Sequence, residues 1–340
     1  MNKPATALSI GIVGAGEITR KSHLPVLLNI PDVEIAWVYD RNPKPALALG
    51  KSHRLRALHS LSPQDLPACD VVLLAIPVDA RAAYLEQSRS SGRAVFCEKP
   101  FARSSAEHAH FAARFAPHAL GAGFMRRFFR STMVLRRIVK QGIFGALIKL
   151  DVSEGNRSKG SGVDSSFLDD PRLGPSRGVL TDLGSHSIDL ALYVSGASDF
   201  AVRSCTAVLD GSVDRKLTAS VQLITEHNPP AQPAEMNYCV SWLDRQENRI
   251  QLTFEHATVW SGLGPAAEVF VTDGKTAGEP LVLATQSPGA TSFNQAFYLE
   301  WQDFLAGFRA GRESAVSARS TLLTTSLVET LLTASGATHA

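Results

Sequence analysis

The stretch of sequence that decides the fold is ALSIGIVGAGEIT, residues 7–19. Its first half, residues 7–13, is a short apolar run typical of a buried strand. Gly14 and Gly16 follow, one residue apart, where a helix is expected to begin. Such glycines let the backbone turn tightly and approach a pyrophosphate, whose charge then lies at the helix N-terminus. The stretch indicates the opening unit of a dinucleotide-binding fold, although an ordinary buried strand and turn could carry the same glycines.

Two positions near this turn bear on the cofactor. Thr19 stands where the usual third glycine falls, and we expect it to push the helix slightly off the strand. Residues 33–39, VEIAWVY, predict a second strand that ends in Asp40. A carboxylate there would hold the adenosine ribose hydroxyls and repel the 2′-phosphate of NADP, whereas Arg41 offers that phosphate a partner. We favour NAD, with Asp40 as a simple turn residue of the loop DRNPKP as the alternative.

The chain up to residue 125 alternates between helical and extended patterns. An alternating β-α order implies a parallel, doubly wound sheet with ligands at the carboxyl ends of its strands. The expected helices are 18–28, 43–52, 80–90 and 104–115, and the expected further strands are 70–76, 93–97 and 119–124. The first of these strands stops at Pro77, and Ser104 with Glu107 is a good helix cap.

Glu98-Lys99-Pro100 follows the strand at 93–97 directly. The tripeptide therefore lies at the carboxyl end of a sheet strand, where a cofactor edge is expected. Pro100 fixes its own φ and restricts Lys99, so the turn is stiff. A lysine held beside a nicotinamide can hydrogen-bond a substrate hydroxyl and lower its pKa. The alternative is a solvated lysine after an edge turn.

Residues 178–196, GVLTDLGSHSIDLALYVSG, predict a helix with Asp182 as its N-cap and Gly196 as its end. Asp182, His186 and Asp189 are four and three residues apart and so share one side of that helix. A histidine can take a proton from an alcohol at neutral pH, and a carboxylate one turn away can orient it. Taken alone, His186 is more often structural than catalytic, and Asp189 could simply form a salt bridge.

Composition limits the other classes of function. The 340 residues suffice for two domains, and the net charge of +2 gives no reason to expect a nucleic-acid or membrane partner. The four cysteines are far apart, so neither a metal site nor a disulfide framework is expected, which fits a reducing cytoplasm. Since no apolar run approaches the roughly 20 residues of a membrane span, we expect none.

The remainder of the chain, residues 126–340, reads as a second domain. Residues 155–175 are polar and long for a loop, either a substrate-facing flap or a partly mobile segment. An antiparallel meander is expected from the alternating segments 200–209, 217–225, 236–243, 249–260 and 267–273. Residues 294–332 are again helical, broken at Gly307 and Gly311 and possessing a core-forming row of Trp301, Phe304 and Phe308. This last helix could pack back on the first domain.

Six basic residues crowd the start of this second domain: Arg126, Arg127, Arg130, Arg136, Arg137 and Lys140. Such a run could bind the diphosphate of a nucleotide sugar. We favour a solvated helix face instead, because charge runs usually lie at the surface. Arg127 is the best exception.

Together these motifs resemble the Gfo/Idh/MocA family, the glucose–fructose oxidoreductase and inositol dehydrogenase group. The resemblance rests on GIVGAGEI (11–18), EKP (98–100), GFMRRF (123–128), IFGALIKL (143–150) and DLGSHSIDLALYVSG (182–196). It implies an N-terminal Rossmann domain, a C-terminal α/β domain with an open and largely antiparallel sheet, and a homodimer or homotetramer. This chain departs from the pattern at Thr19, at Arg81, where the family often has histidine, and at Arg177-Gly178 in place of Gly-Gly.

The resemblance also implies roles for matching residues. Lys99 would contact the reacting hydroxyl and the nicotinamide ribose, Asp182 would orient the substrate, and His186 would be the general base. The Lys99–Pro100 bond is expected to be cis. The residues expected to bind NAD, with NADP possible, are Gly14, Gly16, Glu17, Ile18, Asp40, Arg41, Ile76, Pro77, Glu98 and Lys99. Those expected to bind substrate are Lys99, Arg127, Asp182 and His186.

The function expected is hydride transfer between a nicotinamide and a secondary alcohol or ketone of a sugar, cyclitol or sugar derivative, free or nucleotide-linked. An imine or a diketone is the alternative substrate. The alternative from a different class is a non-catalytic NAD(P)-binding sensor of the same fold. Loss of the lysine or the histidine from the sequence would indicate such a sensor. Lys99 and His186 are both present.

Overall fold

The computed structural model describes residues 7–156, 178–229, 232–273, 279–283 and 287–336. The flap expected at 155–175 lies almost wholly outside the described residues. The chain forms two compact units. The first comprises residues 1–125 and 293–322, and the second comprises residues 126–292 and 323–340.

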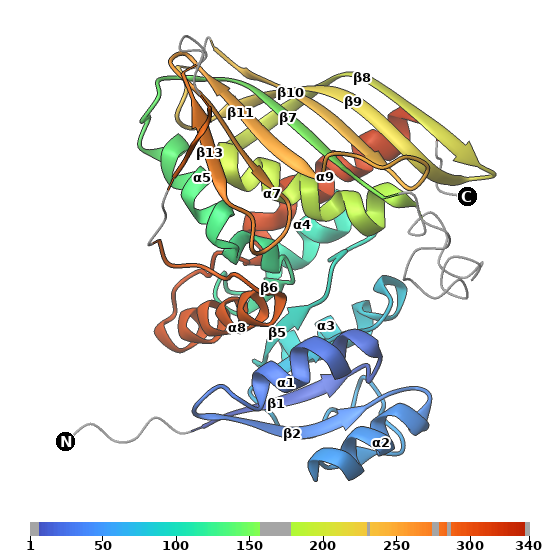
Figure 1. The fold of residues 1–340 in the computed structure, drawn as a ribbon. Coiled ribbons are helices and arrows are strands. Elements are labelled where there is room, and N and C mark those ends of the chain that lie inside the picture. Colours follow the sequence, from blue (N-terminus) through green and yellow to red (C-terminus); the bar gives the residue numbers. More distant parts are fainter. Residues whose placement is uncertain (1–6, 157–177, 230–231, 274–278, 284–286, 337–340) are drawn as a thin grey trace. The chain divides into compact units, whose positions relative to one another are not determined.

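The first unit is built on a parallel sheet of six strands (Figure 1). Its strands are β1 (Leu8–Val13), β2 (Val33–Tyr39), β3 (Ala57–Leu58), β4 (Val71–Leu74), β5 (Ala94–Cys97) and β6 (Leu120–Ala122). Their order is β3-β2-β1-β4-β5-β6, which reverses between β1 and β4. This is the doubly wound order of a dinucleotide-binding sheet, so the predicted fold class is confirmed. Only β3, two residues long, has no counterpart among the predicted strands.

Helices of the first unit begin where the sequence predicts them, to within a few residues. A π-helical turn, Thr19–His23, continues into α1 (Leu24–Leu27), and α2 (Pro43–His53), η2 (Val78–Ala80), α3 (Ala82–Ser90) and α4 (Ser105–Arg114) follow. The Ser104 hydroxyl accepts a hydrogen bond from the Glu107 amide at 3.1 Å, which confirms the predicted cap of α4. Asn42 caps α2 in the same way.

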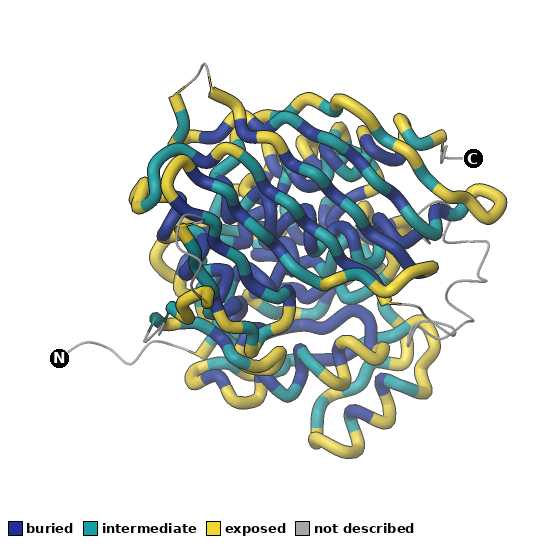
Figure 2. The backbone as a smooth tube through the Cα atoms, turned by 45° about the horizontal axis from the view of Figure 1, so that its top comes forward, coloured by how far each residue is buried: buried dark blue, intermediate teal, exposed yellow. Residues whose placement is uncertain are grey.

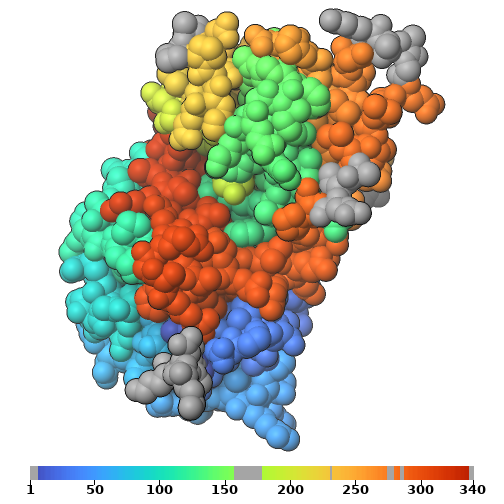
Figure 3. Space-filling view, turned by 90° about the vertical axis from the view of Figure 1, so that its left-hand side faces the viewer, coloured from blue at the N-terminus to red at the C-terminus, as the bar shows by residue number. Residues whose placement is uncertain are grey.

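A late segment of the chain, α8 (Phe293–Ala310), completes the first unit. Trp301 and Phe304 are buried, as predicted, and pack on the ring of Phe96 from β5. Figure 3 shows the orange-red residues of α8 lying directly against the blue residues that include α1. The predicted break at Gly307 is wrong: α8 runs through it, and a Cβ there would lie 2.6 Å from the carbonyl oxygen of Arg312.

The second unit is built on a sheet of eight strands, in the order β14-β13-β12-β11-β7-β10-β9-β8. Its strands are β7 (Leu147–Gly155), β8 (Ala197–Asp210), β9 (Val213–Thr225), β10 (Ala234–Ser241), β11 (Arg249–Phe254), β12 (Thr258–Gly262), β13 (Val269–Thr272) and β14 (Leu281–Val282). The prediction of a simple meander is wrong in two respects. β7 lies between β11 and β10 and runs parallel to β10, and the single strand predicted at 249–260 is the hairpin β11–β12.

One face of this second sheet is covered by helices (Figure 1). They are α5 (Arg130–Lys140), α7 (Ser185–Ser195) and α9 (Ala318–Ala334), the last from Leu323 onward. Buried and half-buried residues alternate along the strands, as Figure 2 shows in dark blue and teal. The buried set points to the helices and forms the apolar core. None of the helices in the described part of the chain has the length and apolarity that a bilayer crossing needs.

Candidate active site

The glycine turn after β1 has the shape that a pyrophosphate requires. Gly14 has φ +103°, and a Cβ at this position would lie 2.2 Å from the carbonyl oxygen of Ala75, so only glycine fits. At Gly16, by contrast, a Cβ would meet no atom within 4 Å. Gly16 and the two residues after it are exposed, with Ile18 38% exposed. The backbone at the start of the helix is therefore open to a ligand, and the residues fit a dinucleotide.

Thr19 takes part in this turn instead of merely disturbing it. Its side chain is fully buried, and its hydroxyl donates a hydrogen bond to the carbonyl oxygen of Gly14 at 2.7 Å. The threonine thus ties the first helical turn to the strand end. This bond offers a physical reason for the departure from the third glycine.

Asp40 combines the two roles that the sequence left open. One carboxylate oxygen accepts a hydrogen bond from the Ala15 amide at 2.8 Å, and the other accepts one from the Asn42 amide at 2.9 Å. Asp40 is therefore a turn residue and also reaches the glycine turn. Each oxygen keeps a second lone pair that can accept from a ribose hydroxyl. The neighbouring Arg41 is exposed.

The turn that holds Lys99 is fixed through the carboxylate of Glu98. The Lys99–Pro100 peptide bond is cis, as expected. One oxygen of Glu98 lies 2.8 Å from Nε2 of His23, and the other accepts from the Lys99 amide at 3.0 Å. Burial pushes the pKa of Glu98 upward, but the hydrogen bond from His23 and the charges of Lys99 and Arg81 outweigh it, so the pKa is lowered. Glu98 is thus held as a carboxylate.

His23 is a functional neighbour that sequence reasoning missed. It is fully buried, and Nε1 of Trp301 donates to its Nδ1 at 3.0 Å. An indole nitrogen can only donate, so Nδ1 is the acceptor and the ring proton lies on Nε2, facing Glu98. The partners are 75 and 278 residues from His23 along the chain. No local spacing could have indicated them.

All the predicted cofactor residues lie on loops that follow parallel strands. Gly14, Gly16, Glu17 and Ile18 follow β1, Asp40 and Arg41 follow β2, Ile76 and Pro77 follow β4, and Glu98 and Lys99 follow β5. Carboxyl ends of parallel strands meet at one edge of a sheet. The first unit therefore brings this set together at the edge where a dinucleotide is expected.

In the second unit, Asp182 and His186 lie on the same helical run, both half-buried. The run begins with the π-helical turn η5 (Leu180–Gly184) and continues as α7, which ends at Gly196 with φ +66°, as predicted. The prediction that Asp182 is the N-cap is wrong, because the helix begins before it. The carboxylate of Asp214, on β9, accepts from the Leu180 amide at 2.7 Å instead. Burial raises the pKa of Asp214.

Gly178 is required by this long-range cap. A Cβ at position 178 would lie 1.4 Å from a carboxylate oxygen of Asp214. We therefore expect Gly178→Ala to displace Asp214 and to leave the buried Leu180 amide without its acceptor, at a cost of about 1–3 kcal/mol in the free energy of unfolding. Urea denaturation measures this cost. Gly264→Ala controls for the loss of a glycine, because a Cβ there would meet nothing within 4 Å and its φ lies outside the left-handed region. Equal stability of Gly178→Ala and the parent protein would contradict the assignment.

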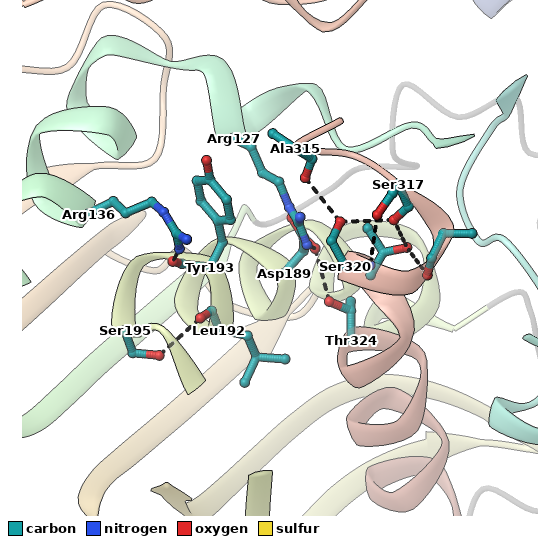
Figure 4. Close-up of polar contacts among 12 residues, drawn as sticks. Arg127, Arg136, Asp189, Leu192, Tyr193, Ser195, Ala315, Ser317, Ser320 and Thr324 are labelled. Carbon is teal, nitrogen blue, oxygen red and sulfur yellow. Dashed lines mark hydrogen bonds and ion pairs between the residues drawn. The ribbon is translucent and has the colours of Figure 1, made fainter. Parts of the chain in front are cut away.

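Asp189 is buried in an ion pair, which supports its interpretation as a salt-bridge residue (Figure 4). Arg127 donates from Nε to one carboxylate oxygen at 2.8 Å and from Nη2 to the other at 2.5 Å, and Thr324 adds a third bond at 2.9 Å. Tyr193 lies between the guanidinium groups of Arg127 and Arg136. α7 is thereby fastened to the segment before α5 and to α9.

The basic run is therefore not simply a solvated face. Arg126, in the turn η3 (Met125–Phe128), is buried and forms an ion pair with Glu154 at 2.8 Å. Arg127 is 3% exposed and paired with Asp189. Arg137 and Lys140 are exposed, as favoured. Apart from the exception made for Arg127, the local pattern does not separate the buried arginines from the exposed ones, because the two acidic partners lie on distant elements.

Tyr238 supports the same helical run from the sheet. Its hydroxyl donates to the Gly184 carbonyl at 3.2 Å and lies 3.1 Å from the Ser187 hydroxyl. Burial raises the pKa of Tyr238 well above its usual value, so the phenol stays protonated and can donate. Gly184 and Ser187, which lie on either side of His186, are thus hydrogen-bonded to Tyr238 of β10.

Comparisons with known proteins agree with the fold of the first unit. Residues 8–119 match the family model GFO_IDH_MocA, described as an oxidoreductase family with an NAD-binding Rossmann fold. Glucose-6-phosphate 3-dehydrogenase of Bacillus subtilis is 28% identical over 210 residues, and inositol 2-dehydrogenase of Rhizobium meliloti is 26% identical over 204 residues. The matches cover 61% and 58% of this chain and only 59% and 58% of those relatives' lengths.

Among solved structures, the aldose-aldose oxidoreductase of Caulobacter crescentus has a similar fold throughout. Its TM-score is 0.78 at 20% identity, and the likeness covers 97% of this chain and 98% of that one. This likeness extends the common fold through the second unit. Residues 8–119 therefore match the NAD-binding Rossmann fold of the Gfo/Idh/MocA oxidoreductase family, and the similar dehydrogenases extend the resemblance to about 60% of the chain.

Proposed function

We propose that the protein is an NAD(P)-dependent oxidoreductase that transfers hydride between a nicotinamide and a secondary alcohol or ketone of a sugar, cyclitol or sugar derivative. The observation that carries the proposal is the Lys99 turn, fixed through Glu98 and His23, at the same sheet edge as the open glycine turn. A lysine and a dinucleotide cradle on one edge are the parts that this chemistry needs.

The glycine turn would hold the pyrophosphate, and Asp40 the adenosine ribose, while Ile76, Pro77 and Glu98 would border the nicotinamide end. When bound, the nicotinamide supplies the hydride acceptor or donor. The carboxylate of Asp40 favours NAD, because its charge would repel the 2′-phosphate of NADP.

Three side chains would act on the substrate. His186 would take the hydroxyl proton in the oxidation direction, Lys99 would stabilise the developing alkoxide with its charge, and Asp182 would orient the reacting groups. Asp182 and His186 are half-buried on one helical run that Asp214 and Tyr238 anchor. Such anchoring keeps a general base in a fixed position.

Arg127 was predicted to bind substrate directly. Two of its donors are engaged by Asp189, and its side chain is 3% exposed. We therefore assign Arg127 to holding α7 in place, so that it supports His186 from within the unit.

The substrate class is supported by the relatives' names, which are a sugar-phosphate dehydrogenase and an inositol dehydrogenase. A further relative, 26% identical over 236 residues, is named as a reductase of a dTDP-linked sugar. The substrate screen described next distinguishes free sugars from nucleotide-linked ones. Assembly as a homodimer or homotetramer and a cytoplasmic location stay predictions.

The test is fluorescence titration with NADH and NADPH, followed by a screen of polyols, sugars, sugar phosphates and nucleotide sugars at 340 nm. Tight NADH binding with turnover of a sugar or cyclitol is the expected result. NADH binding without oxidation or reduction of any screened compound would favour the sensor of the same fold. Absence of binding to either nucleotide would contradict the proposal.

Asp40→Asn is the variant that tests cofactor choice. It removes the charge but retains one oxygen acceptor for the Ala15 or Asn42 amide. We expect the ratio of NADH to NADPH affinity to fall about tenfold, equivalent to about 1.4 kcal/mol. Arg41→Ala is the matched control. If Arg41→Ala changes the ratio and Asp40→Asn does not, then Arg41 selects the cofactor.

A further inference from the structure

Arg81 is a buried cation that the proposed reaction does not use. It lies between η2 and α3, and its residue is only 3% exposed. In the described part of the chain, its hydrogen-bond partners are all backbone carbonyl oxygens. A buried guanidinium without a contacting carboxylate is expensive to desolvate, so its hydrogen bonds must compensate.

These hydrogen bonds join two loops at the carboxyl edge of the sheet. Nε donates to the Ile76 carbonyl at 2.9 Å. Nη1 donates to the Glu98 carbonyl at 2.5 Å, to the Pro100 carbonyl, and more weakly to the Phe101 carbonyl at 3.4 Å. One side chain therefore links the loop after β4 to the turn after β5 that bears Lys99.

Side chains from two other elements hold the turn that bears Lys99. Arg81 holds its carbonyl groups, whereas His23 holds the carboxylate of Glu98, which in turn accepts from the Lys99 amide. The backbone on both sides of Lys99 is thus fixed by side chains from other elements.

The residue type matters at this position. The rigid fork of a guanidinium carries its donors on separate nitrogens, so Nε reaches the Ile76 carbonyl while Nη1 reaches the Lys99 turn, whereas the three donors of an ammonium share one nitrogen. A histidine, frequent here in the family pattern, has only two ring nitrogens and a shorter reach. The departure at Arg81 noted in the sequence is therefore matched by a set of bonds made from two nitrogens of the arginine fork.

We propose that Arg81 is a positioning residue that sets Lys99 and the Ile76–Pro77 loop relative to each other for hydride transfer. This inference rests on the proposed function for its effect on turnover. Its structural part, the rigidity of the Lys99 turn, can be measured without any substrate or cofactor.

The test compares Arg81→Lys and Arg81→Met with Arg103→Met. Arg103 is an exposed arginine close to the same turn, with ion pairs to Asp79 and Glu107. Hydrogen exchange, followed by mass spectrometry, is measured on the peptide covering residues 96–104 and on a reference peptide from β2. Turnover is measured at 340 nm with the compound that the screen identifies, and the Arg81→Met protein is assayed again with added guanidinium chloride at millimolar concentration.

We expect both Arg81 variants to exchange about tenfold or more faster in residues 96–104, with the reference peptide and Arg103→Met unchanged. We expect kcat to fall by a similar factor and to recover in part with guanidinium ion. If Arg81→Met does not fold, Arg81→Lys carries the comparison. Unchanged exchange in the Lys99 turn would overturn the proposal, as would faster exchange with undiminished kcat.

The two proposals fail in different ways. A parent protein that binds NADH but turns over no compound defeats the proposed function. In that case the effect of Arg81 on hydrogen exchange still decides whether it holds the turn, and unchanged exchange rejects it.

Discussion

Replacing His186 by alanine is expected to lower kcat by about 10²–10⁴-fold, the range that general acid–base catalysis usually contributes. His186 is half-buried on a helical run that is held by hydrogen bonds from Asp214 and Tyr238. Because these bonds do not involve the imidazole, the His186→Ala protein should keep its fold. NADH binding should be unchanged, because every predicted cofactor residue belongs to the other unit.

The measurement is steady-state turnover at 340 nm as a function of pH, combined with fluorescence titration of NADH. The variant should keep its lowered kcat across the pH range in which the parent protein turns over. His256→Ala is the matched control, since His256 is exposed in the same unit. A His186→Ala enzyme that keeps the parent kcat would remove His186 from the mechanism.

Replacing Arg127 by methionine is expected to destabilise the protein by about 3–5 kcal/mol, because it leaves the carboxylate of Asp189 buried without its cation. Both side chains are almost fully buried, at 3% and 1% exposed, and two hydrogen bonds join them. Among the described residues, the Thr324 hydroxyl would remain as a hydrogen-bond donor to that carboxylate. Urea denaturation measures the loss, and Arg137→Met, on the exposed face of α5, controls for the removal of a positive charge.

The double variant Arg127→Met with Asp189→Leu separates the charge from the packing. Replacing both partners of a buried ion pair by apolar residues is often neutral, so most of the lost stability should return. A parent-like stability of Arg127→Met, accompanied by a raised KM, would instead return Arg127 to direct substrate contact, the role that the sequence predicts.

The sequence predicts well wherever the determining partners are close along the chain. The strand at 33–39, the cap at Ser104 and the glycine that ends α7 depend on a few neighbouring residues, and all were found. The parallel sheet followed from the alternation of elements. The family resemblance followed from motifs that are themselves local, and it implied the cis bond before Pro100.

The sequence predicts poorly where a buried polar group finds its partner at a distance. Asp182 looked like a cap because the true acceptor, Asp214, lies 34 residues from the Leu180 amide that it binds. Arg127 looked like surface charge or a substrate contact because Asp189 is 62 residues away. The arrangement of β7 beside β10 likewise depends on pairing that no local pattern carries.

The contribution of α8 to the first unit has a consequence for biosynthesis. The ribosome releases residues 1–125 long before residues 293–322, which complete that unit. Until Trp301 emerges, His23 lacks its hydrogen-bond donor and the ring of Phe96 lacks its cover. A nascent chain must therefore carry an unfinished nucleotide-binding half through the synthesis of the whole second sheet, with apolar surface open to chaperones and to aggregation.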